Sequence, residues 1–133
     1  DHMKRAKAHI VPLSEAAMRV LAKANVFRQA DTDVVFPGVS GKPMSDMTLL
    51  KVLRDMAEPY HVHGFRSTFT DWAANEGFAD AVVEAALAHK TPDAVQAAYR
   101  RTTYLGTKEQ PGARVTLMDE WGLYCTGEAA DTD

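Results

Sequence analysis

The sequence predicts a mainly helical domain with a small β element at its N-terminal edge. In several segments apolar residues recur every three or four positions, which is the spacing of an amphipathic helix. Residues that start or stop helices flank most of these segments, and strands do not alternate with helices as a parallel sheet would require. With 133 residues, 46% of them hydrophobic, the chain is long enough for one domain with its own core.

The first elements are a short extended segment and a helix. Residues 9–13 include Pro12, which places them at a strand end or a sheet edge. Ser14 is a typical N-cap for a helix that continues to about Ala24. A second extended piece is expected at residues 34–37, before a turn-rich stretch. The apolar stripe of the helix comprises Ala17, Val20, Leu21 and Ala24.

Two helices are predicted in the middle of the chain. One begins at Ser45, runs to about Ala57 and is ended by Pro59. Its spacing predicts that Leu49, Val52, Leu53 and Met56 are buried. The other helix begins near Gly64 and stops at Gly77. Its wide aromatic face, which must pack on something, comprises Phe65, Phe69, Trp72 and Ala73.

Three more helices are predicted toward the C-terminus. Residues 79–88 bury Val82, Val83, Ala86 and Leu87. Residues 91–93 (Thr-Pro-Asp) supply a cap, a proline at the first helical position and an acid in the first turn of a helix that contains Tyr99. Residues 113–124 place Val115, Leu117, Met118 and Trp121 on one face. Residues 126–133 are expected to be a disordered tail, and residues 1–3 a vector-derived remnant.

Composition restricts the functional classes only weakly. The single cysteine, Cys125, cannot form an internal disulfide, which favours a reducing compartment such as the cytoplasm. No apolar run approaches the roughly 20 residues of a membrane span, so no membrane partner is expected. The net charge of −3 does not favour nucleic acid, but residues 1–66 carry +3 and residues 67–133 carry −6, which permits a local basic surface.

His63 and Arg66 are the sharpest pair of candidate functional residues. An arginine fork binds two phosphate oxygens at once, while an imidazole three residues away can donate to a third or move a proton. The structural alternative is that His63 only caps a helix. His61 and His63 form a His-x-His pair, but no carboxylate or cysteine stands at matching spacing, so no metal site is expected.

Two later residues add to this pair. His89 precedes a predicted helix N-terminus, where backbone amides favour an anion, although such a histidine is often structural. Tyr99 is a candidate nucleophile if cations or a base draw its proton away. Tyr104 competes for that role, and both tyrosines could simply pack their rings.

Taken together, these motifs resemble the catalytic domain of tyrosine recombinases, most closely the integrases of prophages and genomic islands. Residues 62–69 look like the family's His-x-x-Arg helix, residues 87–90 like its second histidine motif, and residues 97–100 like the segment around its nucleophile. Lys4 stands before residues 9–14 at the distance of the family's hairpin lysine. The likeness covers nearly the whole chain up to Trp121, and it implies a bacterial or phage-encoded protein.

The resemblance implies a mechanism. Tyr99 would attack a DNA phosphate and form a 3′-phosphotyrosyl link, which keeps the energy of the phosphodiester, so no cofactor is implied. Arg66 and His89 would stabilise charge on the non-bridging oxygens, and His63 would act as acid or base and phosphate ligand. Lys4 would protonate the departing 5′-oxygen.

The resemblance also implies double-stranded DNA as partner and a homotetramer of the full-length protein on that DNA. Phosphate contacts are expected from the basic residues Lys7, Lys90, Arg100 and Arg101. The family's first catalytic arginine has no counterpart in this chain. Residues 4–125 are therefore expected to be a truncated catalytic domain that is inactive, or nearly so, by itself.

Two other readings stay open on the sequence. The chain could be a helical DNA-binding or protein-interaction module that keeps the fold without chemistry. It could also be a metal-free phosphodiesterase that uses His63 and His89 as acid and base and does not need Tyr99.

Overall fold

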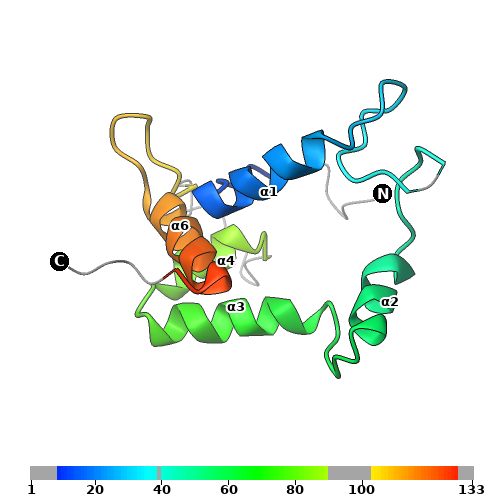
Figure 1. Ribbon diagram of the computed structural model, residues 1–133. Coiled ribbons are helices and arrows are strands. Elements are labelled where there is room, and N and C mark those ends of the chain that lie inside the picture. Colours follow the sequence, from blue (N-terminus) through cyan, green and yellow to red (C-terminus); the bar gives the residue numbers. More distant parts are fainter. Residues whose placement is uncertain (1–8, 39, 90–102, 129–133) are drawn as a thin grey trace.

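The computed structural model of the chain describes residues 9–38, 40–89 and 103–128 (Figure 1). Within these ranges the structure is mainly helical, as predicted, and none of its helices has the length and apolar character needed to cross a membrane. The only strand-like pairings there are two isolated bridges, between Pro37 and Pro43 and between Gly106 and Pro111. The helices are α1 (Glu15–Asn25), α2 (Met47–Asp55), α3 (Gly64–Asn75), α4 (Asp80–Ala86) and α6 (Ala113–Thr126).

The segment before α1 differs from its prediction. Residues 9–13 are irregular and belong to no strand in the described part of the chain. The carbonyl of Ile10 accepts a hydrogen bond from the Arg114 side chain at 2.6 Å, and Pro12 has no amide hydrogen to donate to a strand partner. The predicted sheet edge is therefore replaced by a segment held through side-chain contacts.

α1 begins where the sequence predicts. The Ser14 hydroxyl oxygen accepts a hydrogen bond from the amide of Ala17 at 3.2 Å, and Glu15 places negative charge in the first turn, where it favours the helix dipole. Ser14 is itself buried, with 6% of its surface exposed, because α6 packs directly over it. The cap therefore starts the helix and also forms part of a helix contact.

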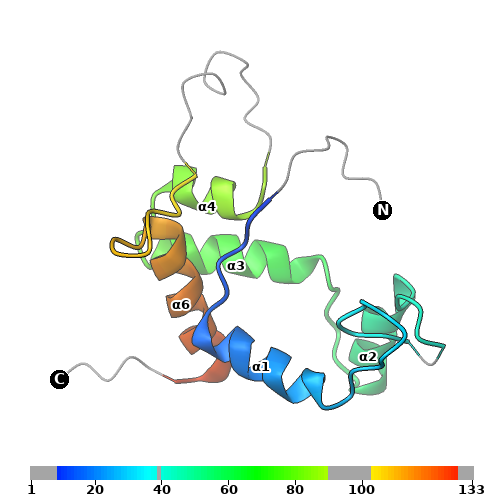
Figure 2. The ribbon, with the colours of Figure 1, turned by 90° about the horizontal axis from the view of Figure 1, so that it is seen from above.

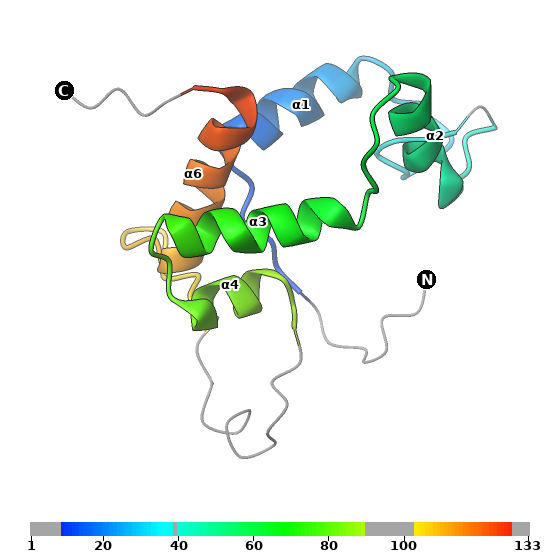
Figure 3. The same ribbon diagram turned by 90° about the horizontal axis from the view of Figure 1, so that it is seen from below.

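The core lies where α3, α4 and α6 meet (Figures 1 and 3). The aromatic face predicted for α3 is confirmed in its second half, where Phe69 and Trp72 are buried; Phe65, one turn earlier, is exposed. Trp121 of α6 closes this cluster, with its ring centre 5.1 Å from Trp72 and 5.2 Å from Phe69. The buried apolar residues are Phe69, Trp72, Ala73, Val82, Val83 and Leu117.

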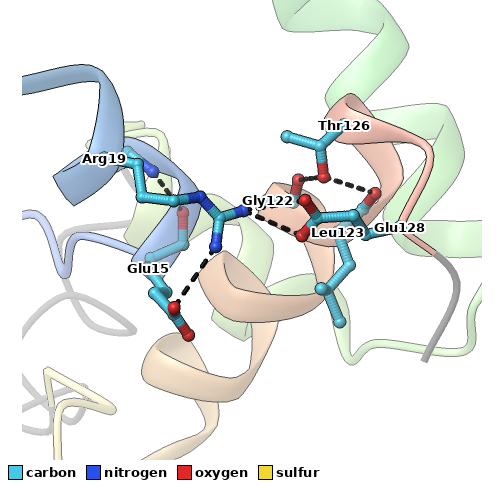
Figure 4. Close-up of polar contacts among 8 residues, drawn as sticks. Glu15, Arg19, Gly122, Leu123, Thr126 and Glu128 are labelled. Atoms are coloured by element: carbon cyan, nitrogen blue, oxygen red, sulfur yellow. Dashed lines mark hydrogen bonds and ion pairs between the residues drawn. The ribbon is translucent and has the colours of Figure 1, made fainter. Parts of the chain in front are cut away.

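α1 and α6 approach each other closely at Gly122. A β-carbon on Gly122 would lie 2.5 Å from the hydroxyl oxygen of Ser14, so only glycine permits this spacing. Near the same contact Arg19 pairs with Glu128 at 2.8 Å and with Glu15 at 3.2 Å (Figure 4). Both pairs are exposed and contribute less than about 1 kcal/mol each.

The C-terminal helix is longer than predicted. α6 includes Thr126, Gly127 ends it in the left-handed conformation at φ 70°, and Glu128 reaches back to Arg19. Regular structure therefore extends into the segment that was expected to be a disordered tail. The Thr126 hydroxyl donates to the carbonyls of Gly122 and Leu123, at 3.0 and 3.2 Å (Figure 4).

α2 forms as predicted, but its apolar face is not buried. Leu49, Val52 and Met56 are exposed by 54%, 48% and 63%. The prediction of their burial was wrong, because α2 contacts none of the other helices in the described chain and lies apart from them (Figures 1 and 2). A helical apolar stripe indicates which face can pack, and here no described helix packs on it.

Candidate functional site

Arg66 lies in the first turn of α3, on a helix whose later turns are fixed by the core. His63 is the N-cap residue, and Arg66 follows one turn on, with its amide donating to the His63 carbonyl at 3.1 Å. Burial of Phe69 and Trp72 on the next turns fixes the rotation of α3 about its axis. The side chain of Arg66 is half-buried and lies beside the end of α4.

His89 is positioned by the way α4 ends. Ala88 adopts the left-handed conformation at φ 52°, the His89 amide donates to the Glu84 carbonyl at 3.0 Å, and the Ala88 amide donates to Ala85. This pair of bonds is the Schellman motif, which turns the chain back over the last turn of its own helix. Without glycine at the left-handed position it costs about 1 kcal/mol. The turn places His89 directly beside Glu84.

The structure brings Arg66 and His89 together. The Nε of Arg66 donates to Nε2 of His89 at 3.1 Å, and an Nη of Arg66 donates to the Leu87 carbonyl at 2.5 Å. The guanidinium thus neutralises part of the negative end of α4. A guanidinium has five N–H donors, and two of them are engaged here. The other three have no acceptor within the described residues, so they remain able to bind an anion.

Glu84 is a member of this cluster that the sequence did not indicate. Its Oε2 lies 2.9 Å from Nδ1 of His89 (both groups are partly exposed). Because arginine only donates, Nε2 of His89 must accept from Arg66, and the ring proton therefore sits on Nδ1 and is donated to Glu84. The sequence signal that could have indicated Glu84 is a carboxylate near the end of a predicted helix, five residues before a histidine that follows the helix.

His63 does not join the cluster through a hydrogen bond in the described part of the chain. Its side chain is exposed and forms no cap bond to α3, so capping does not explain its presence at this position. His61 is also exposed. Across the described ranges no group of three or more His, Cys, Asp or Glu side chains is arranged to hold a metal ion.

The remaining predicted site residues lie outside the described residues. These are Lys4, Lys7, Lys90, Tyr99, Arg100 and Arg101, together with the helix predicted to contain Tyr99. Tyr104, the competing tyrosine, is described; it is half-buried and packs against the core. Its backbone is left-handed at φ 56°.

The described residues that border two of these segments form hydrogen bonds with residues of α4 and α6. Nε2 of His9 lies 3.1 Å from the carbonyl of Ala86, one residue before Leu87, which Arg66 contacts. Arg114 donates to the carbonyls of Ile10 and Thr103, at 2.6 and 3.1 Å. One side chain of α6 therefore ties the chain that follows Lys4 to the chain that follows Tyr99. Figures 2 and 3 show the N-terminal segment passing α4 on its way to α1.

Arg114 is unusual for a charged residue that joins two chain segments, because only 3% of its surface is exposed. Burial lowers the pKa of its guanidinium from the ordinary value. The two terminal nitrogens of Arg114 donate to the backbone carbonyls of Thr103 and Ile10. The Nε of Arg114 has no hydrogen-bond partner among the described residues. The sequence analysis did not single out this residue.

A cavity of about 250 Å³ lies elsewhere, between α1 and α6. Its charged lining residues are Glu15, Arg19, Asp119 and Glu128, so acids outnumber bases. A phosphodiester would be repelled there, whereas the Arg66 and His89 cluster offers donors. The cluster is thus the better candidate for anion chemistry.

Comparison with known proteins gives one consistent result. The sequence profile of the phage integrase family matches residues 1–105. The chain is 33% identical over 107 residues to the prophage integrase IntA of Escherichia coli, covering 77% of this chain and 26% of that protein. It is 33% identical over 131 residues to the integrase of Enterobacteria phage P4, covering 92% of this chain and 28% of that protein.

The chain thus spans about a quarter of the length of these curated relatives. No solved structure matches it. The family match includes the helix with His63 and Arg66, the turn with Glu84 and His89, and the segment with Tyr99. On this match the chain belongs to the phage integrase family.

Proposed function

We propose that this chain is part of the catalytic domain of a site-specific DNA recombinase that cuts and rejoins strands through Tyr99. The observation that carries the proposal is the meeting of Arg66 and His89 at a partly exposed position, where three arginine donors have no acceptor among the described residues. Such a group of donors suits a phosphate, whose negative charge increases in the transition state of phosphoryl transfer.

The proposed chemistry is a pair of transesterifications. The Tyr99 hydroxyl gives its proton to His63 and its oxygen attacks phosphorus, while the bond from phosphorus to the 5′-oxygen breaks and a 3′-phosphotyrosyl link forms. The departing 5′-oxygen takes a proton from Lys4 and becomes a hydroxyl. A 5′-hydroxyl from another strand then gives its proton to Lys4 and attacks the phosphotyrosine, which restores the phosphodiester, and the departing Tyr99 oxygen takes its proton back from His63. One phosphorus–oxygen bond breaks for each one formed, so the scheme needs no external energy source.

Arg66 would bind the scissile phosphate through the donors that have no acceptor among the described residues, and His89 would add a donor from Nε2 when both of its ring nitrogens carry a proton. Preorganised donors of this kind contribute most when water is excluded, and loss of one typically costs about 3 kcal/mol of transition-state stabilisation. His63, one turn from Arg66 on the same helix, would serve as acid, base or additional ligand.

The substrate would be double-stranded DNA, and the full-length protein would act as a homotetramer that holds two recombining sites. Lys7, Lys90, Arg100 and Arg101 would contact phosphates and fix the register of the protein on the duplex. The relatives of this chain are named as integrases, which supports integration and excision of mobile DNA as its biological setting.

Covalent trapping tests the proposal in the full-length protein. A nicked suicide DNA substrate should give a protein–DNA adduct that survives denaturing electrophoresis, because the nicked strand loses the 5′-hydroxyl needed for religation. Tyr99→Phe should abolish the adduct while DNA binding persists. Tyr104→Phe is the matched control: it removes the same hydroxyl from a tyrosine that packs on the core, and the adduct should remain.

The outcomes separate the alternatives. An adduct that persists in Tyr99→Phe and disappears in Tyr104→Phe would reassign the nucleophile. DNA binding without any adduct would support a binding module without chemistry. Cleavage that needs His63 and His89 but leaves no protein on the DNA would support a phosphodiesterase.

A further inference from the structure

We propose that Glu84 is a positioning residue for His89, which sets the orientation and tautomer of its ring so that Nε2 faces Arg66. This proposal deepens the function proposed above and rests on it. The observation behind it is a continuous series of side chains, in which Arg66 donates to His89 and His89 donates to Glu84, at 3.1 and 2.9 Å.

The backbone and the side chains of Glu84 and His89 are joined by separate bonds. The His89 amide donates to the Glu84 carbonyl within the Schellman turn, and this bond does not depend on the Glu84 side chain. The carboxylate holds only the imidazole. Removal of the carboxylate therefore leaves the main chain of His89 in place and releases its ring, so positioning and folding can be tested apart.

The direction of the bonds decides the tautomer. Arg66 has no acceptor atom, so the Nε2 atom of His89 must present a lone pair to it. The remaining ring proton is then on Nδ1 and requires an acceptor, which Glu84 supplies. Arg66 favours the same tautomer, since its bond to Nε2 is also charge-assisted. The two bonds therefore act together, and loss of the Glu84 carboxylate removes the one that holds the proton on Nδ1.

The arrangement also suits the arrival of a phosphate. When a phosphate oxygen takes the Nε hydrogen of Arg66, Nε2 of His89 is released toward the same oxygen. To donate there, His89 must carry a proton on both ring nitrogens, and Glu84 accepts from Nδ1 in the neutral and in the doubly protonated form alike. The carboxylate thus remains bonded while the ring changes from acceptor to donor.

The first test reads the tautomer directly. In the 133-residue chain labelled with ¹⁵N-histidine, long-range proton–nitrogen correlations at mildly alkaline pH report which ring nitrogen carries the proton. His89→Gln identifies the signal. The unmutated chain should show the proton on Nδ1. Glu84→Gln should preserve that state because its amide oxygen still accepts, whereas Glu84→Leu should shift the population toward the Nε2-protonated form.

The second test uses the rate of the covalent adduct in the full-length protein. Glu84→Leu should slow the adduct by about tenfold to a hundredfold, the range seen when carboxylates that orient metal-bound histidines are removed. Glu84→Gln should recover the rate to within about threefold, and DNA affinity should be unchanged in both. Glu120→Leu, which removes an exposed acid from α6, is the matched control for charge and should have no effect.

A double-mutant cycle distinguishes positioning from general destabilisation. In the His89→Gln background, Glu84→Leu should change the rate by less than about twofold, because its effect passes through the imidazole. An unchanged tautomer, an unchanged rate, or an equal further loss in the His89→Gln background would each overturn the proposal. If the unmutated protein forms no adduct at Tyr99, the proposed recombinase function fails, while the tautomer still decides whether Glu84 orients His89.

Discussion

The helices α2 and α6 carry comparable apolar residues, yet only α6 has a packed surface. Leu117 of α6 is fully buried against α3 and α4. Leu49 of α2 is 54% exposed, and α2 contacts no other helix among the described residues. The difference arises from the available partners rather than from helix formation, because both helices form where their spacing predicts.

This contrast indicates where the stability of the described chain originates. Burial of apolar area contributes about 25 cal/mol per Å², so a side chain contributes only in proportion to the area that its neighbours cover. The α3, α4 and α6 cluster should therefore dominate stability, and it is the same cluster that positions Arg66 and His89. The α2 region should contribute little.

The largest predicted effect comes from Leu117→Ala. Since Leu117 is completely buried, the substitution removes the side chain beyond its β-carbon from the centre of the cluster and leaves a cavity. We expect a loss of about 3 kcal/mol in the free energy of unfolding, measured by urea denaturation of the 133-residue chain. A loss below about 1 kcal/mol would mean that the cluster is not the stable part of the molecule.

Several features of the packed helices could be predicted from the sequence. Ser14 as N-cap, the start of α3 near Gly64, and the burial of Phe69, Trp72 and Val82 all follow from local patterns. These features depend on residues three or four positions apart, which the sequence shows directly. The exposure of α2 depends on which helix lies opposite, and no local pattern contains that information.

In the candidate site, too, residues in local motifs could be predicted, and residues whose role depends on distant or unusual backbone contacts could not. The motifs at residues 63–66 and 87–90 indicated Arg66 and His89, and the structure brings these two side chains together. Glu84 was missed because its role depends on the left-handed turn at Ala88, where an alanine replaces the usual glycine signal. Arg114 was missed because charged residues are rarely buried, and its partners are backbone carbonyls far away in sequence.

An intermediate effect is expected from Arg114→Met, which tests whether the buried hydrogen bonds of Arg114 contribute to the stability of the packed helices. Methionine retains much of the side-chain volume but loses the two hydrogen bonds to Ile10 and Thr103. We expect a loss of about 2 kcal/mol, because bonds from a charged donor are strong but burial of the charge already disfavours the native arginine. Urea denaturation measures the loss.

Arg114→Lys is the control for charge, since one ammonium cannot span both carbonyls as the guanidinium does. It should recover only part of the lost stability. Hydrogen exchange of the amides near Ile10 and Thr103 should increase in both variants, and unchanged exchange would show that Arg114 does not tie these two segments together.

The smallest effect is expected from Leu49→Ala, the same chemical change as Leu117→Ala made in α2. Leu49 is more than half exposed, and alanine favours a helix at least as well as leucine, so the free energy of unfolding should stay within about 0.5 kcal/mol of the unmutated chain. The two leucines form a matched pair that differs only in burial. Equal losses at both positions would show that the α2 face is covered in solution, and the contrast between the two helices would then have to be abandoned.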